Sequence, residues 1–290
     1  MSRHELVAAP PPRALRHPAE MPFFVFMVVL NIVIVAAIVR AAYDVPFLPE
    51  QLQDSGVADA IRGALIGLLL FIPGLIVVRE TQRAATRGTA VQLSQRQYPD
   101  LYRTAEAFAT ALGLRRRPDL YLANGNGTLN AFAAQATGHD YVVISNELFA
   151  NLQDGNREGL RFILGHELGH IRLHHVALWY QISVAYSELI PILGPTLSRL
   201  REYSCDRHGA HLSPDGATGL VLLASGRYTE TDVDVAQLLK QGTELRGFWV
   251  GLAQLPRSHP FTVRRLERLF VLGLLRAGAP SRDPAPTRRG

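Results

Sequence analysis

Two long apolar runs lie in the first third of the chain. Pro22 to Val39 is eighteen residues long with Asn31 as its only strongly polar side chain, and a second run of similar length extends from Ile61 to Val78. Both runs are apolar on every face, which is typical of membrane spans and not of helices that bury one side in a soluble core. A cleaved signal peptide does not fit the first run, because the second run follows within about twenty residues. The pattern therefore predicts a two-helix transmembrane hairpin over residues 21–79.

After this hairpin the pattern changes to amphipathic helices and short strands. About 200 residues remain, which is an ordinary size for one catalytic domain. The expected fold class is α+β, mainly α-helical, with a small β-sheet. Expected helices cover 99–112, 146–152, 156–175, 198–212, 217–225, 232–241 and 261–275, and expected strands cover 119–123, 129–136 and 141–145. The expected organisation is an N-terminal segment over 1–20, the hairpin, a domain over 80–276, and a disordered tail rich in Pro, Gly and Arg over 277–290.

One motif inside a predicted helix has the residue types and spacing of a metal-binding site. The letters GHELGH run from Gly165 to His170, and their spacing puts His166 and His170 one turn apart on the same side of the helix. Two imidazoles placed in this way can bind one zinc ion, with Glu167 beside it. Such an ion lowers the pKa of a bound water to about 7, and a neighbouring carboxylate can take the proton as the water attacks a carbonyl. The motif therefore predicts a zinc hydrolase.

A third protein ligand is needed, and the sequence offers candidates at two distances. Close by, His174 is in helical phase but lies a further turn along the helix, and His175 is out of phase. Further along, Glu202 and Asp206 are four residues apart and share one face of a polar stretch that is strongly helical. One of these carboxylates can complete a site of two histidines and one acid, and the other can accept the free N–H of a ligand histidine. The distant pair is favoured.

Four segments follow one another in a characteristic order. They read NAFA at 130–133, GHELGHIRLHH at 165–175, SRLREYSCDRHGA at 198–210, and SHP at 258–260 with Arg265 six residues after the histidine. In this order they resemble the NAF edge strand, the zinc helix, the SRxxExxAD pattern and the HP…R segment of the integral-membrane gluzincin peptidases. That family includes bacterial HtpX and the CAAX prenyl proteases. The resemblance implies a zincin-type metallopeptidase domain that binds one Zn²⁺ per chain.

The same resemblance implies roles for single residues. The implied zinc ligands are His166, His170 and Glu202. Asp206 would be the hydrogen-bonding partner behind the ligands, and Glu167 the general base. His259 and Arg265 would face the cleft and steady the tetrahedral intermediate. The residues implied to pair with the backbone of a substrate are Asn130, Ala131 and Phe132.

Two features depart from the family pattern. Cys205 stands where the family usually has alanine, and a small buried residue is a simpler interpretation of it than a reactive or metal-perturbing thiol. Only 31 residues separate His170 from Glu202, whereas HtpX places two membrane helices in this interval. The short interval limits how the chain can pass between the two ligands.

The interval contains a third apolar stretch, Ala177 to Leu197. A single membrane crossing there would put Glu202 on the opposite side of the bilayer from His166 and His170, and one ion could not bind all three. We therefore expect this stretch to form the end of the zinc helix and a bent hairpin, with a turn at Pro191, Gly194 and Pro195. Whether it dips into the near leaflet is left open.

Charge predicts the orientation of the hairpin. Arginines precede the first span and follow the second one, whereas the loop between the spans is acidic. The arginines are Arg3, Arg13, Arg16, Arg79, Arg83, Arg87 and Arg96, and the acidic residues are Asp44, Glu50, Asp54 and Asp59. By the positive-inside rule, both termini and the catalytic domain are cytoplasmic in a multi-pass protein of the cell membrane.

Composition adds little to this picture. The single cysteine excludes an internal disulfide and fits a reducing compartment. The basic isoelectric point, about 9.6, comes without any nucleic-acid motif, and attraction of the flanking arginines to anionic lipid headgroups explains it more simply. The expected partners are protein or peptide substrates and the lipid bilayer, with no nucleic acid. The sequence does not indicate an oligomeric state.

The expected function is a membrane-anchored zinc endopeptidase. The resemblance implies hydrolysis of peptide bonds in unfolded or damaged membrane-proximal proteins, which is the quality-control role of HtpX. Two alternatives stay open at this point. One is a prenyl-protein processing protease, against which the two evident spans argue, and the other is a non-catalytic membrane-anchored scaffold that binds zinc.

Overall fold

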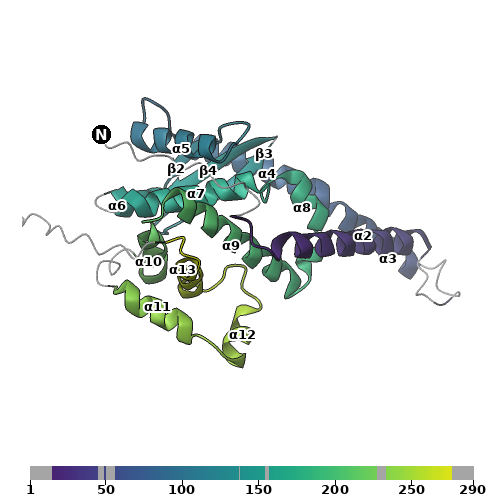
Figure 1. The fold of residues 1–290 in the computed structure, drawn as a ribbon. Coiled ribbons are helices and arrows are strands. Elements are labelled where there is room, and N and C mark those ends of the chain that lie inside the picture. The colour runs from purple at the N-terminus through teal and green to yellow at the C-terminus, as the bar shows by residue number, and fades with distance from the viewer. Residues whose placement is uncertain are drawn as a thin grey trace, which may run out of the picture.

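The computed structural model describes residues 15–44, 49, 56–136, 138–153, 157–226 and 233–275. The predicted tail over 277–290 and most of the predicted segment over 1–20 lie outside the described residues. Within them the chain is mainly helical and contains a four-stranded sheet, which confirms the predicted fold class at this level. A rounded domain carries a projecting helical hairpin (Figure 1).

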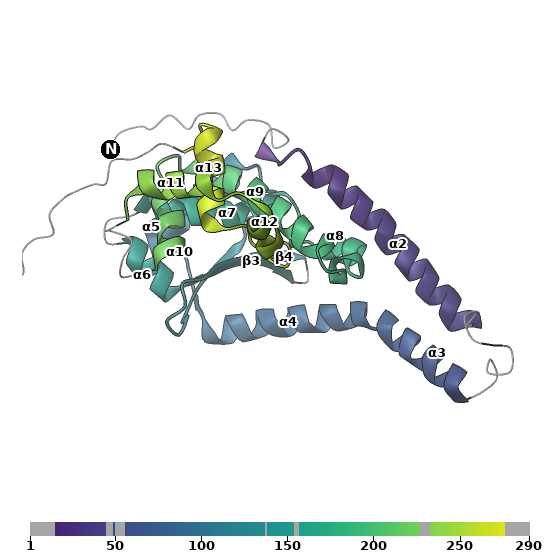
Figure 2. The same ribbon diagram turned by 90° about the horizontal axis from the view of Figure 1, so that it is seen from below.

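The hairpin consists of three helices in two arms (Figure 2). Helix α2 (Glu20–Asp44) forms one arm, and α3 (Gly56–Leu69) and α4 (Phe71–Thr89) form the other. The second arm breaks between α3 and α4 because Pro73 cannot donate a hydrogen bond to the carbonyl four residues before it. Two stretches, Glu20–Tyr43 and Gly56–Thr89, are long and apolar enough to cross a membrane. The two predicted spans are therefore present as helices that qualify by length and composition.

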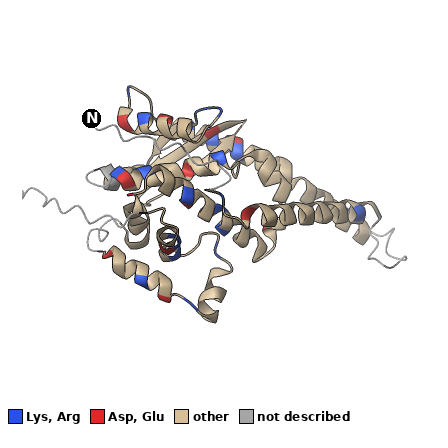
Figure 3. Cartoon of the chain, viewed as in Figure 1, with Lys and Arg blue, Asp and Glu red and all other residues tan. Residues whose placement is uncertain are grey.

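The surface of the hairpin is also apolar. Side chains such as Ile32 and Val77 are 61% and 62% exposed. Charged residues gather on the domain and on the second half of α4, and they are sparse along α2 and α3 (Figure 3). Exposed apolar side chains on this scale are favourable only in contact with lipid or another apolar partner.

The sheet has the order β1-β2-β4-β3. Strand β2 (Asp119–Ala123) pairs in parallel with β4 (His139–Ser145), while β1 (Val91–Gln92) and β3 (Ala131–Ala136) pair antiparallel to their neighbours. The predicted hairpin of β3 and β4 is present, and β4 begins two residues earlier than expected. Strand β3 lies at an edge of the sheet, as the family resemblance implies.

The remaining helices build the rest of the domain. They are α5 (Pro99–Ala111), α6 (Asn146–Gln153), α7 (Arg157–Arg172), α8 (Leu178–Val184), α9 (Leu193–Leu212), α10 (Ala217–Ser225), α11 (Val235–Glu244), α12 (Phe248–Gln254) and α13 (Thr262–Val271). Several differ clearly from expectation. Helix α7 ends three residues early because His174 adopts a left-handed conformation with φ of 65°, and α9 begins five residues early. Helix α11 is shifted by three residues, α13 ends four residues early, and α12 was not predicted.

The apolar stretch from Ala177 to Leu197 is not one continuous helix, and the predicted bend within it is present. It forms α8, a 3-10 turn (Ser187–Leu189) and the first turn of α9, and it lies between the two arms of the hairpin (Figure 2). The Asn31 side chain, on α2, accepts hydrogen bonds from the backbone N–H groups of Tyr186 at 2.8 Å and Ser187 at 3.3 Å. The one strongly polar residue of the first span therefore faces this stretch and not lipid.

Helices α7 and α9 pack unusually closely, and glycines permit it. A Cβ atom at Gly169 would lie 3.1 Å from the His208 Cβ and 3.3 Å from the Cys205 Cα. A Cβ at Gly209 would lie only 2.7 Å from the backbone oxygen of Phe162. Because real Cβ atoms essentially never approach backbone so closely, a larger residue at Gly209 must push the two helices apart.

We expect Gly209→Ala to destabilise the fold by about 1–3 kcal/mol, the range for overpacking a close-packed interior. Gly251→Ala in α12 is the matched control, because nothing lies within 4 Å of the added Cβ there. The control should be neutral or stabilising by up to about 1 kcal/mol, since alanine is the better helix former. Thermal unfolding of both variants in detergent measures the difference. Equal melting temperatures for the two variants would contradict the account of the close packing.

Candidate metal centre

Three side chains from two helices meet inside the domain. His166 and His170 come from α7, and Glu202 comes from α9. The two Nε2 atoms are 3.3 Å apart, and the Glu202 carboxylate oxygens lie 3.5 Å from Nε2 of His166 and 3.4 Å from Nε2 of His170. His166 and Glu202 are buried. The structure thus brings together the three residues that the sequence resemblance implies as ligands.

The donor set and its spacing suit zinc. Bonds of about 2.0–2.1 Å in a tetrahedral arrangement place the ligand atoms about 3.3–3.4 Å apart. The three separations, 3.3, 3.4 and 3.5 Å, agree with this value. Two imidazoles and one carboxylate are also the donor set of a known class of catalytic zinc sites, which keep a fourth position for water or substrate. His166, His170 and Glu202 therefore fit a zinc ion.

Asp206 orients one of the histidines. Its Oδ1 atom lies 3.0 Å from Nδ1 of His166, and Arg265 donates to both carboxylate oxygens at 2.9 and 2.6 Å. Burial opposes ionisation of Asp206, but the charge of Arg265 and the hydrogen bonds outweigh it and lower the pKa of the carboxyl. Because the carboxylate fixes the proton of His166 on Nδ1, the lone pair on Nε2 is free to bind a metal.

His170, the other histidine, contacts a carboxylate through a second histidine, and this arrangement was not predicted. Nδ1 of His170 lies 3.2 Å from Nδ1 of His175, and Nε2 of His175 lies 3.0 Å from a carboxylate oxygen of Glu20. His175 was not expected at the centre, because it is out of helical phase with His170. The left-handed turn at His174 ends α7 and brings His175 back beneath His170.

A second group of potential ligands overlaps the first. Cys205 Sγ lies 3.6 Å from Nδ1 of His175, so that His170, His175 and Cys205 also place three donor atoms close together. Burial raises the pKa of the Cys205 thiol well above its usual value, which disfavours the thiolate. The thiol is completely buried beside Gly169, in agreement with the prediction of a small buried residue.

Glu167 and His259 complete the candidate site. Glu167 follows His166 on α7 and is 7% exposed. Nδ1 of His259 lies 3.1 Å from a Glu202 oxygen, while 68% of its side chain is exposed, so it sits at the rim. Nη2 of Arg265 lies 3.5 Å from the same oxygen, and most of its hydrogen bonding is to Asp206. Both basic residues therefore reach the Glu202 carboxylate.

The charges of the cluster favour a cation. Burial alone would raise the pKa of Glu202, but hydrogen bonds with His166, His170 and His259 lower it well below the usual range. Burial likewise disfavours a charged His166, yet hydrogen bonds to Asp206 and Glu202 raise its pKa to about 10. Buried carboxylates thus stabilise positive charge at the point where the donor atoms converge.

The predicted substrate-binding residues lie in or next to β3, which packs against α7. Asn130 precedes β3, and its backbone oxygen accepts a hydrogen bond from the N–H of Ser145 at 2.8 Å. Ala131 and Phe132 open β3, and Phe132 is 41% exposed. Helix α7 packs against β3. The edge strand therefore runs next to the helix that carries His166, Glu167 and His170.

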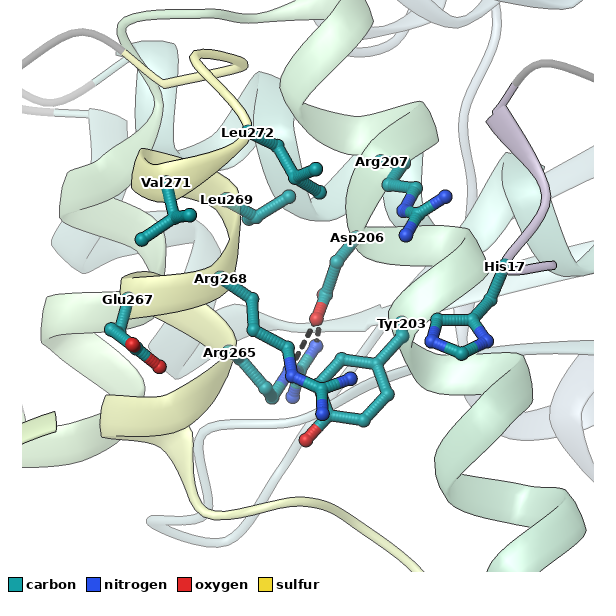
Figure 4. A pocket seen from close by; sticks show the side chains of 10 residues that line it. All are labelled: His17, Tyr203, Asp206, Arg207, Arg265, Glu267, Arg268, Leu269, Val271 and Leu272. Atoms are coloured by element: carbon teal, nitrogen blue, oxygen red, sulfur yellow. Dashed lines mark hydrogen bonds and ion pairs between the residues drawn. The ribbon is translucent and has the colours of Figure 1, made fainter. Parts of the chain in front are cut away.

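A pocket opens beside the ion pair of Asp206 and Arg265 (Figure 4). It lies between α9, α13 and the segment that precedes α2, and Arg268 stacks over the ring of Tyr203 at 4.1 Å from its centroid. The other lining residues are His17, Arg207, Glu267, Leu269, Val271 and Leu272. His166, His170 and Glu202 do not line it, so the pocket borders the centre only through Asp206 and Arg265.

Comparison with known proteins gives a family match. Residues 95–183 match the model of Peptidase family M48. This range includes the strand residues from Asn130 and the HExxH helix, and it ends before Glu202. No solved structure gives a significant match.

The curated relatives that match are each named Protease HtpX homolog. The Protease HtpX homolog of Streptococcus gordonii is 26% identical over 171 residues, which are 59% of this chain and 55% of that protein. The Protease HtpX homolog of Streptococcus uberis is 26% identical over 176 residues, 61% of this chain and 56% of that protein. A shorter match of 82 residues, 34% identical, covers 28% of this chain and 27% of the Protease HtpX homolog of Halobacterium salinarum. The chain thus spans about half the length of the first two relatives.

Two nearby histidines stay outside the donor set. His174 is exposed at the turn after α7. His208 is fully buried on α9, where its Nδ1 lies 2.8 Å from the backbone oxygen of Ser204 and its Nε2 has no hydrogen-bond partner among the described residues. Burial lowers the pKa of His208 to about 4, so the imidazole is neutral in the folded protein at pH 7.

His208 therefore gives the fold a defined pH dependence. Its folded pKa, about 4, lies below the unfolded value of 6.5, so the unfolded state binds more protons between these limits. Stability should fall as the pH drops from about 6.5 to 4, by up to about 3 kcal/mol. His208→Gln should flatten this part of the profile, whereas His139→Gln on the exposed end of β4 should not. Denaturant unfolding of the metal-free proteins across this pH range tests the prediction, and an unchanged slope in His208→Gln would refute it.

Proposed function

We propose that this chain is an HtpX-like metallopeptidase of family M48, and that it acts as a membrane-anchored, zinc-dependent endopeptidase; the motifs and the matches support this assignment. Its substrates are unfolded or damaged membrane-proximal proteins, the quality-control role that the resemblance to HtpX implies. One observation carries the proposal. The donor atoms of His166, His170 and Glu202 converge to within 3.3–3.5 Å of one another in a buried site.

The zinc ligands in this proposal are His166, His170 and Glu202. When bound there, zinc supplies a Lewis acid that makes water nucleophilic near neutral pH and polarises a carbonyl. Asp206 holds the proton of His166 on Nδ1, away from the ligand atom. Glu167, one residue from His166, accepts the proton of the attacking water and passes it to the leaving amine.

His259 and Arg265 supply positive charge. The hydrogen bond to Glu202 raises the pKa of His259 above its usual value, which favours the charged form of this side chain. Its exposed position at the rim lets it contact substrate, and the buried Arg265 adds a fixed charge 3.5 Å from Glu202. Both cations stabilise the oxyanion that develops as the carbonyl is attacked.

The edge strand supports a role in substrate binding. An edge strand carries unpaired N–H and C=O groups along one side, and an extended peptide can pair with them. Strand β3, preceded by Asn130 and opened by Ala131 and Phe132, lies against α7 and presents such an edge. Only a chain segment free of its own secondary structure can pair in this way. The mode of binding therefore favours unfolded substrates.

The ends of the hairpin support an arrangement with domain and N-terminus on one side of the membrane. At the start of the hairpin, the N–H of His17 donates to Ser204 Oγ at 2.8 Å, and Arg207 donates to the Arg16 carbonyl at 3.2 Å. At its other end, α4 leads into β1 after Ala90. Both arms thus return to the domain, and the arginines that flank them make that side the cytoplasm.

The catalytic base gives the most direct test of hydrolysis. Glu167→Gln should retain zinc, because the residue is not a ligand, and should lose at least about two orders of magnitude in the rate of casein cleavage. Metal analysis and a protease assay on the same preparation measure both quantities. Near-normal cleavage by this variant would contradict the mechanism, and zinc binding without any cleavage by the wild type would indicate a scaffold.

The third ligand is tested by metal content. Glu202→Ala should bind zinc much more weakly, because it removes one of the three protein ligands. His174→Ala should keep the metal, since this exposed side chain points from the turn after α7. Zinc per chain after dialysis against a weak chelator distinguishes them. If His174→Ala empties the site and Glu202→Ala does not, the assignment is wrong.

Membrane topology is tested with single cysteines in a Cys205→Ala background. Pro49 lies between the arms, Arg116 lies in the domain before α8, and Lys240 lies after α9, all at exposed positions. An impermeant thiol reagent should label position 49 in intact cells, and positions 116 and 240 only after the membrane is opened. Labelling of position 240 from outside with position 116 protected would mean that the stretch over 177–197 spans the membrane.

A further inference from the structure

We propose that Glu20, in the first turn of the membrane helix α2, is a positioning residue for the metal centre, acting on His170 through His175. The inference rests on the zinc-binding part of the proposed function and adds a residue from the membrane hairpin to the site. It also assigns a role to His175, which none of the proposed catalytic steps uses.

The hydrogen bonds determine where each proton lies. A carboxylate only accepts hydrogen bonds, so the contact of 3.0 Å between Glu20 and Nε2 of His175 places a proton on that nitrogen. Nδ1 of a neutral His175 then carries a lone pair and accepts the N–H from Nδ1 of His170, 3.2 Å away. This leaves the lone pair of His170 on Nε2, the atom that faces His166 and Glu202 at 3.3 and 3.4 Å. One carboxylate thus sets the protonation of two imidazoles.

The carboxylate of Glu20 is held firmly for this purpose. It is completely buried, which is unfavourable for a carboxylate without partners. Its second oxygen accepts a hydrogen bond from the hydroxyl of Ser204 on α9, and Nε of Arg16 lies 3.4 Å from the oxygen that contacts His175. A buried glutamate at the start of a membrane helix therefore has a complete set of partners inside the metal domain.

The arrangement repeats the one around the first histidine ligand. His166 contacts Asp206 directly, and Asp206 pairs with Arg265. His170 contacts Glu20 through His175, and Glu20 pairs with Arg16. Each metal-binding histidine is thus backed by a carboxylate and an arginine. Such partners fix ring orientation and raise the basicity of the ligand.

The same geometry argues against a metal bound by His170, His175 and Cys205. That set needs a lone pair on Nδ1 of His170, the atom that carries a proton when Nε2 faces His166 and Glu202. A neutral imidazole offers one lone pair, so the two sets compete for His170. The contact with Glu20 supports the set of His166, His170 and Glu202, because it makes Nδ1 of His175 an acceptor for the His170 proton.

The experiment measures zinc affinity in the full-length protein in detergent by competition with a chromophoric chelator. Glu20→Leu should weaken zinc binding about 10–100-fold, the usual effect of losing a partner of a ligand histidine. Glu20→Gln should retain most of the affinity, because its amide oxygen can accept the same hydrogen bond from His175. Asn31→Leu is the matched control, since it removes another buried polar contact between α2 and the domain without touching His175. Its zinc affinity should equal that of the wild type.

Two results would overturn the inference. One is equal zinc affinity in the wild type and Glu20→Leu, and the other is an equal loss in Glu20→Leu and Asn31→Leu, which would reflect the docking of α2 and not the contact with His175. Cleavage assays separate this inference from the proposed function. A wild-type protein that binds zinc in a Glu20-dependent way but cleaves no peptide contradicts the hydrolytic function alone, whereas a wild type that binds no zinc contradicts both.

Discussion

The proposed metal centre depends on α7 and α9 lying close enough for their side chains to share one ion. Because zinc bonds are only about 2 Å long, the ligand atoms of His166, His170 and Glu202 must lie about 3.3 Å apart. Glycines at the contact let the helices approach until a Cβ at Gly169 would stand 3.3 Å from the backbone of Cys205. The connection between the helices must then fold back within a few turns, as α8 and the 3-10 turn do. Helix α13 packs on α9 and brings Arg265 to Asp206.

The helical hairpin also packs against the domain, through its first arm. Two polar side chains of α2, Glu20 and Asn31, point at α9 and at the stretch after α8, while Ile32 and Val33 beside Asn31 are 61% and 58% exposed. Ring stacking of Phe24 on Tyr180, 4.2 Å between centroids, adds an apolar contact between them. A helix that serves only as a tether needs no such contacts. The first arm of the hairpin is therefore packed as part of the metal domain.

Much of the candidate site could be predicted because its residues are spaced four apart on single helices. Residues four apart on one helix share a face, which places His166 with His170 and Glu202 with Asp206 without knowledge of the fold. The requirement that one ion bind all three ligands also predicted that the chain bends back within residues 177–197, and the structure shows such a bend. The predicted apolar spans, the edge strand and the mainly helical fold likewise follow from local pattern or from the family resemblance.

The remainder depends on long-range contacts or on backbone conformations that local pattern does not signal. Glu20 lies just before the first apolar run, where an acidic residue is normally exposed, and its burial depends on α9. His175 contacts His170 only because His174, a residue other than glycine, adopts a positive φ, which is uncommon. Strand β1 has only two residues, too few to show the alternation of apolar and polar positions that indicates a strand. In α12 the large apolar residues Phe248 and Trp249 are 74% and 77% exposed, so apolar positions do not mark a buried helix face there.

The central claim, that α7 and α9 together bind one zinc ion through His166, His170 and Glu202, is tested most directly by X-ray absorption at the zinc edge. The account predicts only nitrogen and oxygen neighbours at about 2.0–2.1 Å in the zinc-loaded wild-type protein, and an identical spectrum for Cys205→Ala. A sulfur neighbour at about 2.3 Å that disappears in Cys205→Ala would contradict it, because zinc would then be bound by Cys205 in the overlapping group with His170 and His175.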